Sequence, residues 1–205
     1  MEKDVVDAGT ESGIFRVLVV AGVGLALAVG CGHQNRVSSV DVLNLKGERI
    51  DPFEASDAVV NLFLFTRSDC PISNRYAPRV RGLYARLAPR KVHFWLVYSD
   101  PDESVEAIQA HASTYEYPGE ILRDREHELV RLTGVQVTPE VAVFNAAREM
   151  VYRGRIDDQY VDFGEFRAAP TQHDLEEAVE ATLQGRPVAN PRTAAVGCFI
   201  SDLRR

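Results

Sequence analysis

Two long apolar segments, residues 59–66 and 92–98, dominate the hydrophobic pattern of the chain. Neither segment alternates between apolar and polar residues, as a strand with one solvent-facing side would do. Continuous apolar strands of this length are typical of a sheet that helices cover on both faces. These segments therefore predict two buried central strands.

The pattern changes to helical spacing directly after Cys70. Pro78 falls inside this helical segment, where its ring and its missing N–H are expected to kink the helix. Apolar residues recur every three or four positions along one face of the predicted helix: Ile72, Tyr76, Val80, Leu83, Tyr84 and Leu87.

A capping pattern predicts where a second helix begins. Asp100 would cap this helix, Pro101 would occupy its first position and Glu103 its third. Apolar residues continue at helical spacing as far as Tyr115. Pro118 is expected to end the helix because it cannot continue the hydrogen-bond pattern.

Shorter periodic segments predict the remaining elements. Strands that alternate with helices and then end in a hairpin indicate an α/β fold, with a central mixed sheet flanked by helices on both faces. The expected strands are residues 40–45, a short segment around Ile121, residues 141–144 and residues 150–155, and the expected helices are residues 126–132 and 175–183, the last with Thr171 as its cap.

Composition and charge restrict the classes of function. The chain has 205 residues, of which 45% are hydrophobic and 26% charged, as in an ordinary globular protein. Residues 40–205 are enough for one well-buried domain. The net charge of −7 leaves no basic stripe for phosphate contacts, so we expect no nucleic-acid binding. The five histidines lack ligand spacing, and the sequence predicts neither a metal site nor a cofactor.

The N-terminal segment has the pattern of an export signal. Residues 17–30 carry no charge, and a run of this length is short for a membrane-spanning helix but fits a secretory signal. The Ala-Val-Gly run before Cys31 resembles a bacterial lipoprotein signal. We expect residues 1–30 to be removed, Cys31 to carry a lipid anchor to the membrane, and residues 31–39 to tether a periplasmic, cell-envelope domain. An uncleaved anchor and plain secretion are the alternatives.

Cys70 is the leading candidate for chemistry. It follows a buried strand and precedes Pro71, which suits the first position of a helix. Backbone N–H groups and the helix dipole at such a position favour a thiolate. Arg67, Arg75 and Arg79 are close enough in sequence to favour the thiolate further, whereas Asp69 would oppose it. The alternative is a buried cysteine without reactivity.

The Cys-Pro-Ile-Ser segment that begins at Cys70, after a buried strand, resembles the active-site segment of the thioredoxin-like superfamily. The similarity is to the redoxin branch, which contains thiol-disulfide oxidoreductases and peroxiredoxin-like proteins. It covers residues 40–200 and implies the thioredoxin-like fold. Thioredoxins carry a second cysteine where this chain has Ser73, so an ordinary local dithiol is not expected.

The same resemblance implies roles for residues later in the chain. Thr138 and Pro139 match the position at which thioredoxin-like proteins carry a cis-proline facing the active cysteine. Cys198 lies in a Gly-Cys-Phe-Ile tail similar to that of exported redoxins, and it would resolve a mixed disulfide unless it is only structural. Asp157 lies in an Arg-Ile-Asp-Asp segment similar to one in the same proteins. It would be a proton acceptor or positioner near the thiol, or else cap a turn.

Four functions remain open from the sequence. The first is a cell-envelope thiol-disulfide oxidoreductase in which the Cys70 thiolate attacks a disulfide and is released by Cys198 or an external thiol. The second is reduction of a hydroperoxide through a sulfenic acid at Cys70, although Thr66 lies one position too far from Cys70 for the peroxiredoxin motif. The third is a copper-binding module that uses both thiolates. The fourth is a non-catalytic adaptor.

Overall fold

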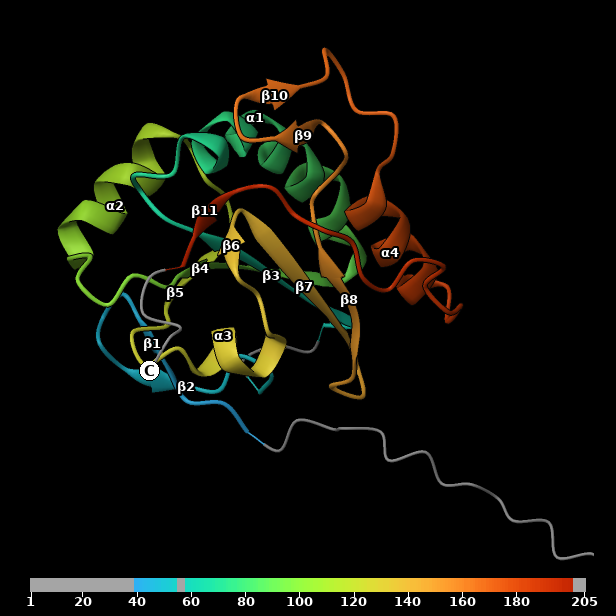
Figure 1. Cartoon of the computed structure of the whole chain (residues 1–205). Helices are drawn as coiled ribbons and strands as arrows, with labels where there is room; N and C mark the ends of the chain where they lie inside the picture. The colour runs from blue at the N-terminus through green and yellow to red at the C-terminus, as the bar shows by residue number, and fades with distance from the viewer. Residues whose placement is uncertain (1–38, 55–57, 201–205) are drawn as a thin grey trace, which may run out of the picture. The chain divides into compact units, whose positions relative to one another are not determined.

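A seven-stranded mixed sheet forms the centre of the structure (Figure 1). The structure is a computed structural model that describes residues 39–54 and 58–200. The strand order is β2-β1-β5-β4-β3-β7-β8. The strands are β1 (Val42–Asn44), β2 (Arg49–Ile50), β3 (Val60–Thr66), β4 (Val92–Tyr98), β5 (Glu120–Arg123), β7 (Glu140–Asn145) and β8 (Met150–Gly154).

The two long apolar segments form neighbouring parallel strands at the middle of this sheet. β3 and β4 pair in register from Val60 opposite Val92 to Thr66 opposite Tyr98. Every residue of β3 is buried, and so is every residue of β4 except His93. β7 pairs with the other edge of β3 in the antiparallel direction. The missing alternation in the sequence therefore indicated burial on both faces correctly.

Helices cover both faces of the sheet, which confirms the predicted α/β class. Leu62 and Leu64 of β3 belong to one buried cluster, and Phe63 and Phe65 belong to the other, because alternate residues of a strand point to opposite faces. The first cluster includes residues of α1 (Pro71–Leu87), α2 (Val105–Thr114) and α4 (Asp174–Leu183), and the second includes residues of α3 (Glu128–Thr133); a 3-10 helix, η1 (Ala88–Arg90), follows α1.

α2 begins later than the sequence predicts. Ser104 caps this helix by accepting a hydrogen bond from the N–H of Ala107 at 3.2 Å. Asp100 instead accepts the N–H of Asp102 at 3.0 Å within a turn, and its carboxylate pairs with Arg67 at 3.2 Å. The prediction of a cap at Asp100 is therefore wrong, because a turn and an arginine from another loop engage this side chain.

The cap predicted for the last helix is also wrong. α4 begins at Asp174 after His173, whose side chain makes no capping hydrogen bond. The hydroxyl of Thr171 donates instead to Asp158 at 2.6 Å, and the N–H of Thr171 donates to the same carboxylate. Thr171 is thus bound to Asp158, and it lies three residues before the first residue of α4.

Within the described part of the chain, four strands of two or three residues lie outside the main sheet, and the sequence pattern did not predict them. β9 (Tyr160–Asp162) and β10 (Glu165–Phe166) form a hairpin close to α1 (Figure 1). β6 (Val137–Thr138) pairs with β11 (Cys198–Phe199), the last strand of the C-terminal tail. This second pair brings Cys198 and Phe199 to the start of β7.

The predictions for the N-terminus fall outside the described part of the chain. These are the export signal of residues 1–30, Cys31 and nearly all of the tether at residues 31–39. Within residues 39–54 and 58–200, no helix is both long and apolar enough to cross a membrane. The lipid anchor stays a prediction.

Candidate active site

Cys70 lies at the N-terminus of α1, after the loop that follows β3. Its sulfur accepts a hydrogen bond from the N–H of Ser73 at 3.5 Å, so the thiol group itself caps the helix. Pro71 occupies the first helical position, where no N–H is needed. Cys70 is buried, with 0% of its area exposed. This position at the positive end of a 17-residue helix favours a thiolate.

The segment before β7 places Thr138 and Pro139 against the sulfur of Cys70. The peptide bond between Thr138 and Pro139 is cis, as predicted. The thiol of Cys70 donates a hydrogen bond to the carbonyl oxygen of Thr138 at 2.9 Å. The cis-proline segment therefore faces the cysteine.

The hydroxyl groups of Ser73 and Thr138 surround the same sulfur. Both residues are fully buried, and within the described chain neither hydroxyl has a hydrogen-bond partner that would compete with a thiolate at Cys70. Burial raises the pKa of the Cys70 thiol, but hydrogen bonds from Cys198, Ser73 and Thr138 outweigh burial and lower this pKa. Ser73, which replaces the second cysteine of a thioredoxin, thus stabilises the thiolate.

The C-terminal tail brings Cys198 to the same place. β11 pairs antiparallel with β6, and Cys198 lies opposite Thr138. Ile200 extends this pairing by donating its N–H to the carbonyl oxygen of Gln136 at 3.0 Å. Gly197 packs so closely that a Cβ would collide with the carbonyl oxygen of Thr138 and lie 2.7 Å from its carbon. The approach of the tail therefore requires glycine at this position.

Cys70 and Cys198 are free thiols, and each of them shifts the pKa of the other. Burial, the hydrogen bond to Cys70, and the charges of Cys70 and Asp69 raise the pKa of Cys198 to about 12. Since the same pairing lowers the pKa of Cys70, the proton stays on Cys198 and the negative charge forms on Cys70. The arrangement provides one nucleophilic sulfur and one protonated neighbour.

Arg67 acts on the C-terminal tail. Sequence proximity suggested the thiolate at the start of α1 as its target, but its guanidinium donates to the carbonyl oxygen of Phe199 at 3.2 Å. The same group pairs with Asp69 at 3.1 Å and with Asp100 at 3.2 Å. Its charge lowers the pKa of Cys198. The structure therefore connects Arg67 with the second cysteine.

Asp157 belongs to a buried polar cluster beside α1. Its carboxylate accepts the hydroxyl of Tyr76 at 2.6 Å and the N–H of Gln159 at 3.0 Å. It also pairs with Nε of Arg79 at 3.3 Å, and Arg79 contacts Nδ1 of His173 at 2.6 Å. These contacts favour the turn-capping role of Asp157, in which it holds the segment after β8 against α1.

The sequence pattern did not predict a network of buried and partly buried hydrogen bonds that reaches the loop between β3 and α1. His111 contacts the hydroxyl of Tyr98 and the side-chain oxygen of Asn74, each at 2.7 Å. Asn74 donates to the carbonyl oxygen of Ser68 at 3.1 Å, so these hydrogen bonds hold the loop between β3 and α1. His111 lies next to the apolar positions of α2 in the sequence, but this spacing alone does not indicate which side chains it hydrogen-bonds.

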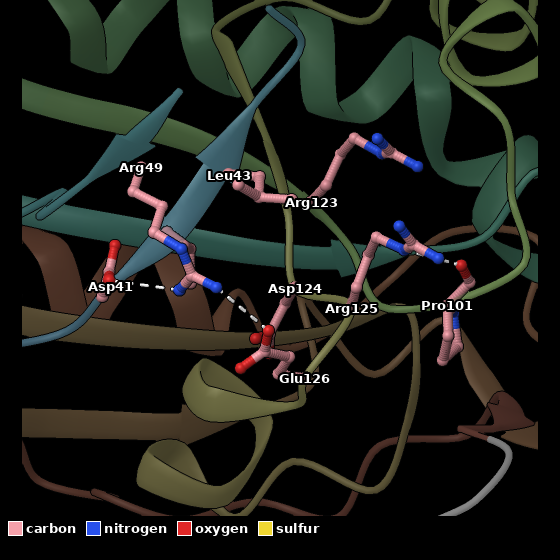
Figure 2. A pocket seen from close by; sticks show the side chains of 9 residues that line it. Asp41, Leu43, Arg49, Pro101, Arg123, Asp124, Arg125 and Glu126 are labelled. Atoms are coloured by element: carbon pink, nitrogen blue, oxygen red, sulfur yellow. Dashed lines mark hydrogen bonds and ion pairs between the residues drawn. The ribbon is translucent and has the colours of Figure 1, made fainter. Parts of the chain in front are cut away.

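A pocket of about 290 Å³ lies beside β1, β2 and the end of β5 (Figure 2). Neither cysteine lines it. Arg49 bridges Asp41 and Glu126 at 3.1 Å each, and Arg125 donates to the carbonyl oxygen of Pro101 at 2.9 Å. Because these charges are engaged within the chain, we place the candidate active site at Cys70.

Solved structures share the fold. An uncharacterized conserved protein from Geobacillus kaustophilus is 22% identical with a TM-score of 0.70, covering 82% of this chain and 90% of that chain. A hypothetical protein from Sinorhizobium meliloti is 25% identical with a TM-score of 0.65, covering 80% and 91%. The thioredoxin domain of a thiol-disulfide oxidoreductase from Bacteroides vulgatus is 11% identical with a TM-score of 0.50, covering 58% and 86%.

A comparison with known protein families identifies the domain. No curated protein matches the chain. Residues 34–154 match the AhpC/TSA family, a range that includes Cys70 and the cis-proline segment but ends before Cys198. The match spans more than half of the chain, and the sheet, the helices and the shared structures are those of a thioredoxin-like redoxin domain. The chain therefore belongs to the AhpC/TSA family.

Proposed function

We propose that this protein is a two-cysteine thiol-disulfide oxidoreductase whose redox pair is Cys70 and Cys198. The thiolate of Cys70 attacks one sulfur of a substrate disulfide, forms a mixed disulfide and releases the other substrate sulfur as a thiolate. Cys198 then attacks the sulfur of Cys70, forms the internal disulfide and releases the second substrate thiolate. The protons of the two cysteines go to the two leaving thiolates, and two electrons pass to the substrate.

The pairing of Cys198 with Thr138 carries this proposal. The backbone of β6 positions Cys198 across from Thr138, and the carbonyl oxygen of Thr138 binds the thiol of Cys70. Each of the two cysteines shifts the pKa of the other, which supports the closeness of the two side chains that an internal disulfide needs. Ser73 has no sulfur with which to resolve a mixed disulfide, so the tail supplies the second thiol.

The environment of Cys198 also fits the order of the two steps. The hydrogen bond and the charge of Cys70 contribute to the raised pKa of Cys198, so Cys198 stays protonated while Cys70 is a free thiolate. Both contributions disappear when the Cys70 sulfur enters a mixed disulfide, because that sulfur no longer carries charge. Cys198 then loses its proton more readily, at the stage when a second nucleophile is needed.

The test is the state of both thiols after reaction with oxidised glutathione. The purified protein should lose two hydrogens in intact mass, become resistant to alkylation at both cysteines, and recover both thiols on reduction. Cys198→Ser should stop at a glutathione adduct on Cys70, and Cys70→Ser should stay unmodified. If both cysteines of the wild type remain open to alkylation under every oxidant, the proposal is wrong.

A hydroperoxide is the second candidate substrate, and the burial of Cys70 favours it. With 0% of its area exposed, the sulfur is easier for a small oxidant to reach than for a protein disulfide. The thiolate would take one peroxide oxygen to become a sulfenic acid and release an alcohol or water, and Cys198 would then form the disulfide with loss of water. Faster disulfide formation with hydrogen peroxide than with oxidised glutathione, at equal concentration, would select this substrate.

We propose in addition that the domain works in the cell envelope, attached through lipid on Cys31. The uncharged run of residues 17–30 before that cysteine supports this location. Cys31→Ser should move the protein from the membrane fraction to the released fraction of the envelope. An unchanged distribution would contradict the lipid anchor and leave the redox proposal unaffected.

A further inference from the structure

We propose that Arg67 is a positioning residue that holds the C-terminal tail next to Cys70 through its hydrogen bond to the carbonyl oxygen of Phe199. This contact, called the latch below, would set the rate at which Cys198 closes the internal disulfide. This inference rests on the proposed pairing of Cys70 with Cys198. It assigns the control of the second step to a side chain that takes no part in the bond exchange.

The contacts of Arg67 connect the loop of one cysteine with the strand of the other. Arg67 lies in the loop between β3 and α1, and one of its terminal nitrogens donates to the carbonyl oxygen of Phe199 at 3.2 Å. The other terminal nitrogen pairs with Asp69 and Asp100. Only 17% of the Arg67 side chain is exposed, so these partners fix its orientation. A directed hydrogen bond from a held guanidinium is suited to restraining a strand.

The tail needs such a restraint beside Cys198. The side chain of Phe199 is 78% exposed and packs little against the domain, whereas Ile200 is buried. Upstream, Thr193 is fixed because its hydroxyl contacts the hydroxyl of Tyr152 at 2.6 Å. Between these two anchors, β11 is a strand of two residues, which is too short to be stable by itself. Arg67 supplies a side-chain bond to the backbone at this point.

The positive charge of Arg67, like its hydrogen bond to the tail, favours attack by Cys198, because it lowers the pKa of Cys198. The charged and titratable groups that face Cys198 are Cys70, Asp69 and Arg67, and Asp100 neutralises part of Arg67 from the loop before α2. Once Cys70 is in a mixed disulfide, Asp69 and Arg67 remain. Of these two, only Arg67 favours the Cys198 thiolate, which is the attacking species.

The experiment follows both steps with the neutral disulfide 4,4′-dithiodipyridine, which releases one thiopyridone per thiol that reacts. In the wild type, the first release reports the attack of Cys70 and depends on reagent concentration. The second release reports closure by Cys198 and does not depend on that concentration. In Arg67→Gln, we expect the first phase to be as fast as in the wild type or faster, because the C-terminal tail moves away from Cys70 more often. The second phase should be at least tenfold slower.

Two matched variants separate positioning from a general loss of structure. Arg75→Gln removes an exposed arginine of α1 that lies over the Phe166 ring, and both of its phases should match the wild type. Arg67→Lys keeps the positive charge but loses the planar set of N–H donors with which the guanidinium binds Phe199 and the two aspartates at once. It should slow closure less than Arg67→Gln, and the pH midpoint of its second phase should stay near that of the wild type. The midpoint of Arg67→Gln should move to higher pH.

The outcomes distinguish this inference from the proposed function. If the wild type releases a single thiopyridone, the Cys70–Cys198 pair itself is wrong. If the wild type shows both phases and the second phase of Arg67→Gln lies within twofold of it, the pair stands and the latch is wrong. A first phase that slows as much as the second in Arg67→Gln also overturns the latch, since both steps would then share one structural defect.

Discussion

Cys198 lies opposite Thr138 in the short antiparallel pair of β11 and β6, and the carbonyl oxygen of Thr138 also accepts the thiol of Cys70. One backbone segment thus positions both sulfurs. The second thiol arrives from the end of the chain instead of from the next turn of α1, where Ser73 stands. A serine at the second motif position therefore does not remove the possibility of an internal disulfide.

Gly197→Ala should separate the two cysteines without unfolding the domain. The added Cβ would collide with the carbonyl oxygen of Thr138, so β11 has to move away from β6. We expect disulfide closure to slow by roughly tenfold or more, because a displacement of about 1 Å at a reacting centre can cost on the order of a hundredfold in rate. The two-phase release of thiopyridone measures this directly.

Gly82→Ala is the matched control for this substitution. Gly82 lies within α1, and a Cβ there would meet only the end of the Arg86 side chain, at 3.5 Å. Alanine is the better helix former, so this variant should gain roughly 0.5–1 kcal/mol in unfolding free energy and close its disulfide at the wild-type rate. Equal closure rates in Gly197→Ala and Gly82→Ala would show that β11 does not control the distance between the thiols.

Ser73→Ala should raise the pKa of Cys70. The hydroxyl of Ser73 is one of the donors that lower this pKa, and the backbone N–H of residue 73 remains in the variant. Fewer donors mean less thiolate at neutral pH, so the midpoint of Cys70 alkylation should move to higher pH. At pH 7 the rate should fall roughly tenfold, if the lost bond to a charged group contributes ~1.5 kcal/mol.

The measurement is site-resolved alkylation of the reduced protein as a function of pH, read by peptide mass spectrometry. Cys198 serves as an internal reference, because its pKa of about 12 keeps it protonated across the range in which Cys70 titrates. An unchanged Cys70 midpoint in Ser73→Ala would mean that this hydroxyl does not bind the thiolate.

Elements that depend on local periodicity were predictable from the sequence. The apolar run of residues 59–66 marked β3, and the spacing after Cys70 marked α1 with Pro78 inside it. Hydrophobic patterning records burial, and burial decides these elements. The position of Cys70 at a helix N-terminus followed from the same local signals.

Features that depend on long-range pairing were not predictable in this way. β6 and β11 have two residues each and exist because they pair with each other, so neither leaves a periodic signal. The role of Arg67 was assigned from sequence proximity to Cys70, yet its hydrogen-bond partner Phe199 is 132 positions away. Spacing along a chain does not tell which loop a long side chain will reach.

The start of α2 offers a direct test of one wrong prediction. Ser104→Ala removes the side chain that caps Ala107, and it should cost about 1 kcal/mol in unfolding free energy. Asp100→Ala should leave the cap intact and instead loosen Arg67, so its effect should appear in the closure of the disulfide. Urea unfolding and thiopyridone release, measured on both variants, should therefore give opposite rankings. The same ranking in both assays would mean that Asp100 also contributes to the helix start.

Tyr76 and Asp157 allow a decision between the two roles considered for the buried aspartate. Asp157→Ala would leave the hydroxyl of Tyr76 and the guanidinium of Arg79 without their shared partner, at a cost of about 3 kcal/mol in unfolding free energy. Tyr76→Phe removes only one neutral donor and should cost about 1 kcal/mol. Burial and the nearby carboxylate raise the pKa of Tyr76, so its hydroxyl stays a donor over the whole range of these measurements.

The rate of Cys70 alkylation separates support of the fold from participation in chemistry. A residue that caps a turn and holds α1 should change the urea midpoint and leave the alkylation rate at pH 7 within about twofold, since the donors around the sulfur are untouched. A proton acceptor for the thiol would behave in the opposite way, with a large fall in the alkylation rate of Asp157→Ala. Because the carboxylate accepts its hydrogen bonds from Tyr76 and Gln159, away from the sulfur, we expect stability to change and reactivity to stay constant.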